Sequence, residues 1–206
     1  MRPIELKIKG INSYREEQVI NFNQLTSQGF FGIFGPTGSG KSTILDAITL
    51  ALYAKLPRGS KNFININETS ASVSFRFSIT TTETKEYLVE RSFRYPGKDR
   101  SSTARNTTAR LSLLSDVDTE ILADKPTDVT RSCTDLLGLS SDDFLRTVVL
   151  PQGQFSDFLK LKNQERRGML QRIFHLERYG IELTRKVAAA RQRMDIEVSS
   201  SEGQLQ

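Results

Sequence analysis

Apolar and polar residues alternate along several stretches of this chain, which is the pattern of half-buried β-strands. Residues 4–8 and 18–22 alternate on either side of the polar turn Asn12-Ser13-Tyr14-Arg15, and they predict a hairpin-like pair of strands. Further along, the apolar run Phe30-Phe31-Gly32-Ile33-Phe34 predicts a short buried strand. The N-terminal part of the chain is therefore expected to contribute three strands.

Two longer alternating stretches predict an antiparallel meander in the middle of the chain. Residues 71–79 and 87–93 have a period of two, and shorter strands are expected at 109–114 and 120–122. Loops are expected at the polar stretches 56–69 and 96–106.

Apolar spacings of three and four residues predict three helices. The first covers residues 44–53 and is apolar on most of its surface, so it should be buried on most sides. The second follows Pro126, carries Cys133 as a half-buried residue and ends near Gly138. The third covers residues 141–148, and its first three residues, Ser-Asp-Asp, are expected to cap it.

A heptad-like pattern begins near Asn163, after which the chain has no proline. Apolar residues recur mainly at spacings of four and three, at Met169, Ile173, Leu176, Leu183, Val187, Ala190, Met194 and Val198. A helix of some 40 residues would extend about 60 Å and could not fold back onto a domain of this size. We expect residues 1–160 to form a globular lobe and residues 161–206 to start an outgoing coiled-coil helix. The alternative is an amphipathic surface helix that stops near Gly180.

A glycine-rich loop separates the run at 30–34 from the first helix. It matches the phosphate-binding pattern G-x-x-x-x-G-K-[S/T], called Walker A, and comprises Gly35, Pro36, Thr37, Gly38, Ser39, Gly40, Lys41 and Ser42, with Thr43 closing it. Glycines let successive backbone N–H groups point at an anion, while the lysine reaches the β- and γ-phosphates and the Ser42 hydroxyl binds Mg²⁺. The sequence therefore predicts binding of ATP and Mg²⁺ ahead of a helix whose dipole favours the phosphates.

Composition and charge add weaker constraints. The net charge of +5 is compatible with a nucleic-acid partner. No apolar run approaches the ~20 residues of a membrane span, and no signal peptide is evident, so we expect a cytoplasmic protein with no membrane contact. One cysteine and one histidine form neither an internal disulfide nor a zinc site.

An acidic residue at the end of a buried strand, which ATP hydrolysis needs for its metal, is not evident. The nearest candidate is Asp116, after a strand interrupted by serines. We therefore expect the acidic half of the site to lie outside these 206 residues. The chain also ends in mid-heptad, which suggests a split ATPase head whose second lobe follows the coiled coil.

The motifs resemble the N-terminal lobe of the bacterial SbcC family, the coiled-coil ATPase partner of a nuclease in double-strand-break repair. The resemblance covers nearly the whole chain and rests on the Asn12-Ser13-Tyr14 turn, the loop Gly35 to Thr43, Leu45-Asp46-Ala47-Ile48, Ile121-Leu122-Ala123-Asp124-Lys125, and Val148 to Phe155 running on to Phe158-Leu159. The resemblance implies an α/β fold: half of a P-loop, ABC-type ATPase head, with a mixed sheet plus an antiparallel meander around the nucleotide-binding helix.

The same resemblance implies roles for residues outside the loop. Gln152 corresponds to the Q-loop glutamine, which completes the Mg²⁺ shell or holds the attacking water, and Gln154 remains an alternative. Lys41 and Gln152 are thus the expected catalytic residues. Asn12 and Ser13 are expected at the nucleotide, although archaeal and eukaryotic relatives tend to have arginine where this chain has Asn12.

The implied partners are the C-terminal lobe of the same full-length chain, a second copy of the head, an SbcD-type nuclease at the coiled-coil base, and double-stranded DNA in a nucleoid-associated complex. ATP would gate the nuclease on DNA ends or hairpins. The alternatives are an SMC-like clamp that entraps DNA without a nuclease, and a self-contained P-loop NTPase. Candidate DNA contacts are Lys98, Arg100, Arg105, Lys160, Lys162, Arg166 and Arg167, which an ordinary solvated face would equally explain.

Overall fold

The computed structural model describes residues 1–26, 29–56, 62–97, 102–115, 118–149, 162–173 and 181–203. They fall into two units, Met1–Phe155 and Ser156–Gln206, which are considered separately below.

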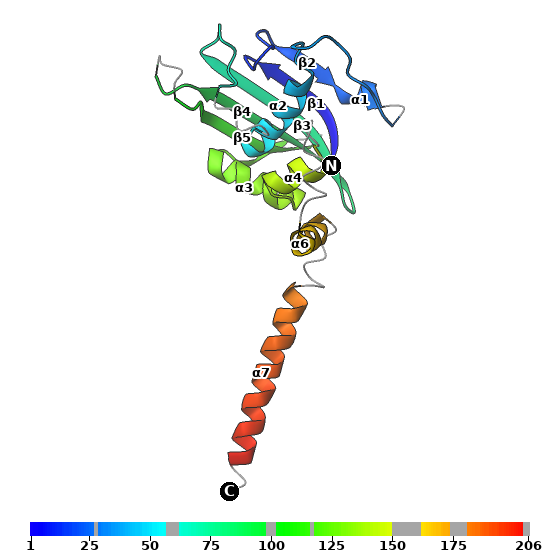
Figure 1. Ribbon diagram of the computed structural model, residues 1–206, viewed down its shortest axis with the longest axis vertical. Coiled ribbons are helices and arrows are strands. Elements are labelled where there is room, and N and C mark those ends of the chain that lie inside the picture. The colour runs from blue at the N-terminus through cyan, green and yellow to red at the C-terminus, as the bar shows by residue number, and fades with distance from the viewer. Residues whose placement is uncertain are drawn as a thin grey trace. The chain divides into compact units, whose positions relative to one another are not determined.

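A six-stranded antiparallel sheet is the framework of the first unit (Figure 1). Its strands lie in the order β2-β1-β3-β4-β5-β6. Their bounds are β1 Arg2–Lys9, β2 Gln18–Asn21, β3 Ser70–Thr80, β4 Thr84–Arg94, β5 Arg105–Leu114 and β6 Thr119–Ala123. The expected hairpin-like pair and the meander are therefore confirmed, although β5 begins within the stretch that the sequence predicted to be a loop.

Period-two alternation gives this sheet one buried and one exposed face. On β3, Ala71, Val73, Phe75 and Phe77 are buried, while the intervening residues, including Ser74, are only partly covered. The buried face packs against two helices: α2 (Lys41–Tyr53) contacts β3 and β4, and α3 (Pro126–Leu137) contacts β5 and β6. The core of the first unit lies between this face and these helices.

The described residues of the first unit include four helices: α1 Phe22–Leu25, α2 Lys41–Tyr53, α3 Pro126–Leu137 and α4 Ser141–Thr147. As predicted, α2 is buried along most of its length, because only a few of its residues, such as Leu45, are exposed. Gly138 ends α3 in the left-handed conformation with φ 66°, which confirms the expected stop.

Three local expectations are wrong. The residues of the run 30–34 form no strand, and Phe30 and Phe34 are 83% and 94% exposed. A strand forms only where its backbone groups find a partner, and no described strand pairs with this run. The cap of α4 is Ser140 rather than the following run, since the Ser140 hydroxyl accepts from the Asp143 amide at 3.2 Å. Cys133 is fully buried rather than half-buried, because it lies on the side of α3 that faces the sheet.

Two helices, α6 Asn163–Ile173 and α7 Ile181–Gly203, are described in the second unit. The seam residues Leu183, Val187 and Met194 are exposed on α7, as a coiled-coil face without its partner would be. Residues 174–180, including Gly180, lie outside the described residues, so an unbroken helix from Asn163 stays a prediction. Among the described residues, no helix has the length and apolar character needed to cross a membrane.

Candidate nucleotide-binding site

The glycine-rich loop lies between the exposed segment 30–34 and the N-terminus of α2, so its backbone leads directly into the first turn of a helix. Gly38 and Gly40 have φ of 85° and 90°, a region that L side chains rarely adopt. Gly40 is the residue before α2, and no side chain caps the first N–H groups of this helix. Uncapped N–H groups at a helix N-terminus can donate hydrogen bonds to an anion.

Lys41 turns back over the loop. Its Nζ donates to the carbonyl oxygens of Gly35 and Pro36, both at 2.7 Å, and to Ser39 Oγ at 3.4 Å. The ammonium charge is therefore held over the residues that the pattern assigns to phosphate binding. Ser42 follows in the first turn of α2 and is exposed.

The Asn12–Ser13 turn packs against this loop, although it lies about 30 residues earlier in the chain. Ser13 Oγ donates to the Gly38 carbonyl oxygen at 2.7 Å, and Asn12 Nδ2 donates to Thr43 Oγ1 at 3.4 Å. Asn12 itself has a positive φ of 47°, which asparagine tolerates better than most residues. The two residues thus lie at the phosphate-binding loop.

Tyr14, the next residue, covers Gly40. A Cβ atom on Gly40 would lie 2.8 Å from Cε2 of Tyr14, which is closer than carbon atoms normally approach. Partial burial of the Tyr14 ring raises the pKa of its hydroxyl. Only glycine therefore satisfies both the backbone conformation and the close approach at this position.

A third segment, residues 62–68, holds the turn in place. Asn65 Nδ2 donates to the Asn12 carbonyl oxygen at 2.6 Å, and the Asn12 amide donates to the Phe63 carbonyl oxygen at 2.8 Å. A hollow of about 510 Å³ beside this contact is lined by Asn12, Ser13, Asn62, Ile64, Asn65, Ile66, Asn67 and Tyr95. Ile66 is 81% exposed. The hollow thus combines amide groups with one open apolar side chain.

Several predicted site residues lie outside the described residues. These are Gln152, the alternative Gln154 and the candidate acid Asp116, so their positions stay predictions. Among the described residues, no three His, Cys, Asp or Glu side chains form a group that would hold a metal ion. The hydroxyl of Ser42 is consistent with the Mg²⁺ of a P-loop, which is bound through few protein groups and the phosphates themselves.

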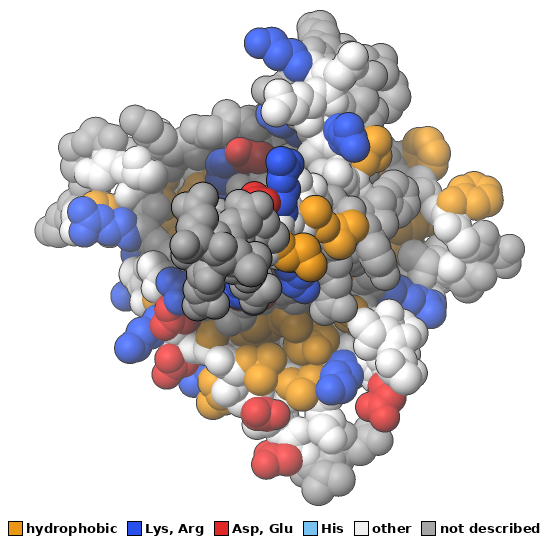
Figure 2. All heavy atoms as spheres, turned by 90° about the horizontal axis from the view of Figure 1, so that it is seen from below, with side chains coloured by type: hydrophobic (Ala, Val, Ile, Leu, Met, Phe, Trp, Pro, Cys, Tyr) orange, Lys and Arg blue, Asp and Glu red, His pale blue; other side chains and the backbone are white. Residues whose placement is uncertain are grey.

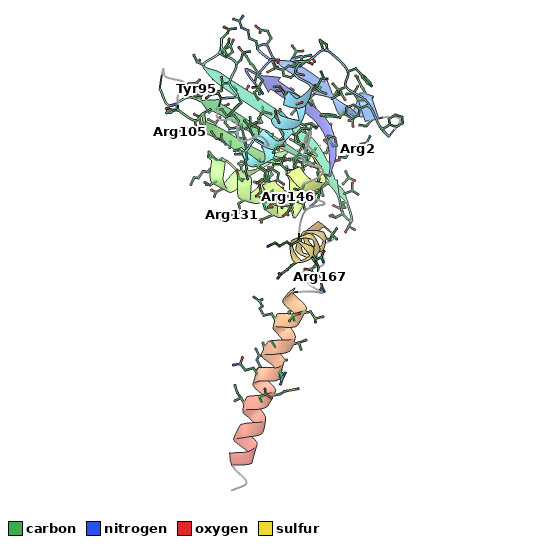
Figure 3. All side chains as sticks on the ribbon, viewed as in Figure 1. Arg2, Tyr95, Arg105, Arg131, Arg146 and Arg167 are labelled. Carbon is green, nitrogen blue, oxygen red and sulfur yellow. The ribbon has the colours of Figure 1, made fainter. Side chains whose placement is uncertain are left out.

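The predicted basic cluster is divided between the two units. Arg105 begins β5 in the first unit, whereas Arg167 belongs to the second (Figure 3). Lys162 also belongs to the second unit. Lys98, Arg100 and Lys160 lie outside the described residues, as does the side chain of Arg166. On the face drawn in Figure 2, the basic side chains that are described are interspersed with acidic ones. A DNA contact by this cluster stays a prediction.

The sequence did not predict the contacts that hold the Asn12–Ser13 turn and the glycine-rich loop in place. Asn65 was not singled out, and Tyr14 was named only as part of the Asn12-Ser13-Tyr14 turn, because neither belongs to a phosphate-binding pattern. The asparagines at 62, 65 and 67 were interpreted only as signs of a loop. Their polar repeat beside the isolated Ile66 was the one available signal.

Comparisons with known proteins find relatives that match nearly the whole chain. The AAA domain family matches residues 5–204. The chain is 49% identical over 207 residues to the SbcC component of the nuclease SbcCD from Clostridium acetobutylicum, and the match covers 98% of this chain and 18% of that protein. It is 50% identical over 190 residues to the protein of the same name from Bacillus subtilis, where the match covers 91% and 16%.

A more distant relative is "Probable DNA double-strand break repair Rad50 ATPase" of Aquifex aeolicus, at 34% identity over 194 residues, covering 92% of this chain and 18% of that protein. A solved structure from work titled "Structural biochemistry of ATP-driven dimerization and DNA stimulated activation of SMC ATPases" has a TM-score of 0.53 and 22% identity. The match covers 84% of this chain and 99% of that one. This likeness shows an SMC head-like fold.

Proposed function

The chain belongs to the AAA domain family of ATPases, and from this premise we propose that it is the N-terminal, phosphate-binding lobe of an SbcC-type ATPase. The ATPase would gate a nuclease in double-strand-break repair. The chain spans between 16% and 18% of the length of these curated relatives. The observation that carries the proposal is the position of Lys41, whose ammonium group lies over the loop. The Asn12–Ser13 turn is hydrogen-bonded to this loop, and the loop leads into a helix without a side-chain cap.

In this proposal the triphosphate of ATP lies on the loop from Gly35 to Thr43. Backbone N–H groups of the loop and of the first turn of α2 donate to phosphate oxygens. Lys41 adds a positive charge that is already aimed at the loop, and the Ser42 hydroxyl holds Mg²⁺. A bound Mg²⁺ would neutralise charge that develops on the transferred phosphoryl group.

The nucleoside would occupy the hollow beside the loop. Its volume of about 510 Å³ exceeds what a purine needs, and Asn62, Asn65 and Asn67 are among its lining residues. The exposed Ile66 provides an apolar surface for a flat base. We propose that Asn12 and Ser13 contact the nucleotide from the same side.

The remaining groups for hydrolysis would come from outside the described residues. Gln152 is proposed to sense the metal and the γ-phosphate. A C-terminal lobe of the full-length chain would supply the acidic residue and pair with the exposed segment 30–34, because Phe30 and Phe34 are apolar side chains left open to solvent.

In the whole protein, two heads would close on ATP and open after hydrolysis. This motion would control access of double-stranded DNA to an SbcD-type nuclease at the base of the coiled coil that α7 begins. We propose a cytoplasmic, nucleoid-associated site of action. An SMC-like clamp without a nuclease is the alternative, and copurification with a nuclease distinguishes the two.

The proposal is tested by measuring ATP turnover by residues 1–206, first alone and then mixed with the C-terminal lobe that the same gene encodes. We expect no turnover by either part alone and turnover by the mixture that Lys41→Ala abolishes. Turnover by residues 1–206 alone would mean that they contain a complete site, and Asp116 would then be the first residue to substitute.

A further inference from the structure

Arg91 is a buried cation in the middle of β4. It is 1% exposed, and among the described residues it is one of the largest side chains that are fully buried. No carboxylate of the described residues forms an ion pair with it. A charge that is removed from water without an opposite charge needs another source of compensation.

That compensation comes from the last turn of α2, the helix that begins at the phosphate-binding loop. Arg91 Nε donates to the Ala51 carbonyl oxygen at 2.6 Å, and Nη2 donates to the Leu52 carbonyl oxygen at 3.2 Å. These carbonyls have no partner within the helix, and a helix C-terminus carries a partial negative charge. The guanidinium therefore caps the end of α2 opposite to the phosphates.

The same guanidinium also contacts the start of α3. Nη1 donates to the Pro126 carbonyl oxygen at 3.3 Å, and Nη2 donates to Thr130 Oγ1 at 3.0 Å. A helix N-terminus repels a cation, so these bonds fix geometry more than they favour the charge. Burial lowers the pKa of Arg91 to about 10, and the group is therefore still protonated at neutral pH.

The segment after α3 is fixed to the same end of α2. Tyr53 donates its hydroxyl to the Leu139 carbonyl oxygen at 2.9 Å, and its ring packs on Phe144 with centroids 5.4 Å apart. Lys55 forms an ion pair with Asp142 at 2.6 Å. The last turn of α2 is thus the point where β4, α3 and α4 meet.

We propose that Arg91 is a positioning residue for ATP hydrolysis, because it fixes the register of α2, and hence of the phosphate-binding loop, against α3 and α4. This inference rests on the proposed function. A helix of 13 residues is about 20 Å long and moves as a rigid rod, so a displacement of its last turn carries Lys41, Ser42 and the loop along with it as one body. The contacts that build the loop itself do not involve Arg91.

The consequence is a separation of binding from turnover. The loop, its glycines and Lys41 remain intact without Arg91, so we expect nucleotide affinity to change by less than about threefold. Hydrolysis needs groups from beyond the loop to stay aligned, and misplacement by about 1 Å costs on the order of 10²-fold. We therefore expect turnover per bound nucleotide to fall at least about tenfold.

The test uses the full-length protein encoded by the gene, with the variants Arg91→Lys and Arg91→Met. Lysine keeps the charge but has no planar guanidinium that can donate to α2 and α3 together. Arg91→Lys therefore tests whether Arg91 positions α2, even if Arg91→Met does not fold. Binding sites are first counted by titration with a non-hydrolysable ATP analogue and Mg²⁺, and turnover is then expressed per site. Arg94→Met, an exposed arginine on the same strand, is the matched control.

Lower turnover per site at nearly unchanged affinity in Arg91→Lys supports the inference. Unchanged turnover per site with only a lower melting temperature would overturn it, because Arg91 would then serve stability alone. Loss of affinity would overturn it as well, because the residue would then build the binding loop. The proposed function fails separately, if Lys41→Ala in the same protein keeps its turnover.

Discussion

Ser13 Oγ donates a hydrogen bond of 2.7 Å to the carbonyl oxygen of Gly38, in the middle of the phosphate-binding loop. The bond joins the turn after β1 to a loop residue with a positive φ. It therefore restrains the loop at Gly38, because glycine has more backbone conformational freedom than other residues.

Removing this hydroxyl should weaken nucleotide binding. A net hydrogen bond contributes about 1 kcal/mol, so Ser13→Ala is expected to raise the dissociation constant for ATP roughly fivefold and to change stability little. Fluorescence titration with a labelled ATP analogue measures this change. Ser72→Ala, on β3, is the control, and an equal loss in both variants would contradict the proposed role.

Gly40→Ala should abolish nucleotide binding, because the new Cβ would meet the Tyr14 ring at 2.8 Å and φ would stay at 90°. The double variant Gly40→Ala with Tyr14→Ala removes the clash but leaves the strained φ, so we expect partial recovery. Gly29→Ala has a similar φ of 82° with nothing within 4 Å, and it isolates the backbone cost in thermal unfolding. Full binding by Gly40→Ala alone would show that the loop adopts another conformation.

The exposed phenylalanines should matter for assembly and not for the folding of this lobe. Phe30→Ser with Phe34→Ser is expected to leave the melting temperature of residues 1–206 unchanged or slightly higher, because both side chains are already in water. The same variant should lose binding to the C-terminal lobe in a pull-down or calorimetric titration. Phe75→Ser, which places a hydroxyl in the core, is the destabilising control.

Cys133 should be inert in the folded protein. Burial raises the pKa of its thiol to about 12, and its side chain is 0% exposed, so very little thiolate is present or accessible at pH 8. Reaction with a thiol reagent should therefore be much slower in buffer than in denaturant. Rapid reaction of the folded protein would mean that α3 opens readily.

The same shift predicts a dependence of stability on pH. The folded-state pKa lies above the value of 9.0 for a free thiol, so the folded protein binds more protons than the unfolded chain between the two values. The contribution of Cys133 is fully present below about pH 9 and is lost as pH rises toward 12. Denaturant unfolding at pH 8 and pH 10.5 measures this loss, and equal stability at both values would contradict it.

Local patterns were sufficient for most elements of this fold. The alternation along β3 and β4, the apolar surface of α2 and the glycine that ends α3 each reflect interactions within a few residues, or the simple rule that one face is buried. The phosphate-binding loop was equally easy to identify in the sequence, because its function needs fixed residue types at fixed spacing.

Residues 30–34 show where local patterns fail. Five apolar or small residues in a row favour a buried strand, but a strand also needs a neighbour for its backbone groups, and composition does not say whether an edge is available. No described strand pairs with residues 30–34, and the side chains of Phe30 and Phe34 stay exposed.

The sequence by itself determined the strands, the main helices and the chemistry of the loop, because these depend on periodicity and on residue types close together in the chain. Only the tertiary structure decided that Ser13 lies on Gly38, that Asn65 holds the turn at Asn12, and that Arg91 caps the far end of α2. These contacts join residues 25 to 53 positions apart. Their partners are mostly backbone carbonyls, which every residue carries, and so no side-chain pattern in the sequence could have identified them.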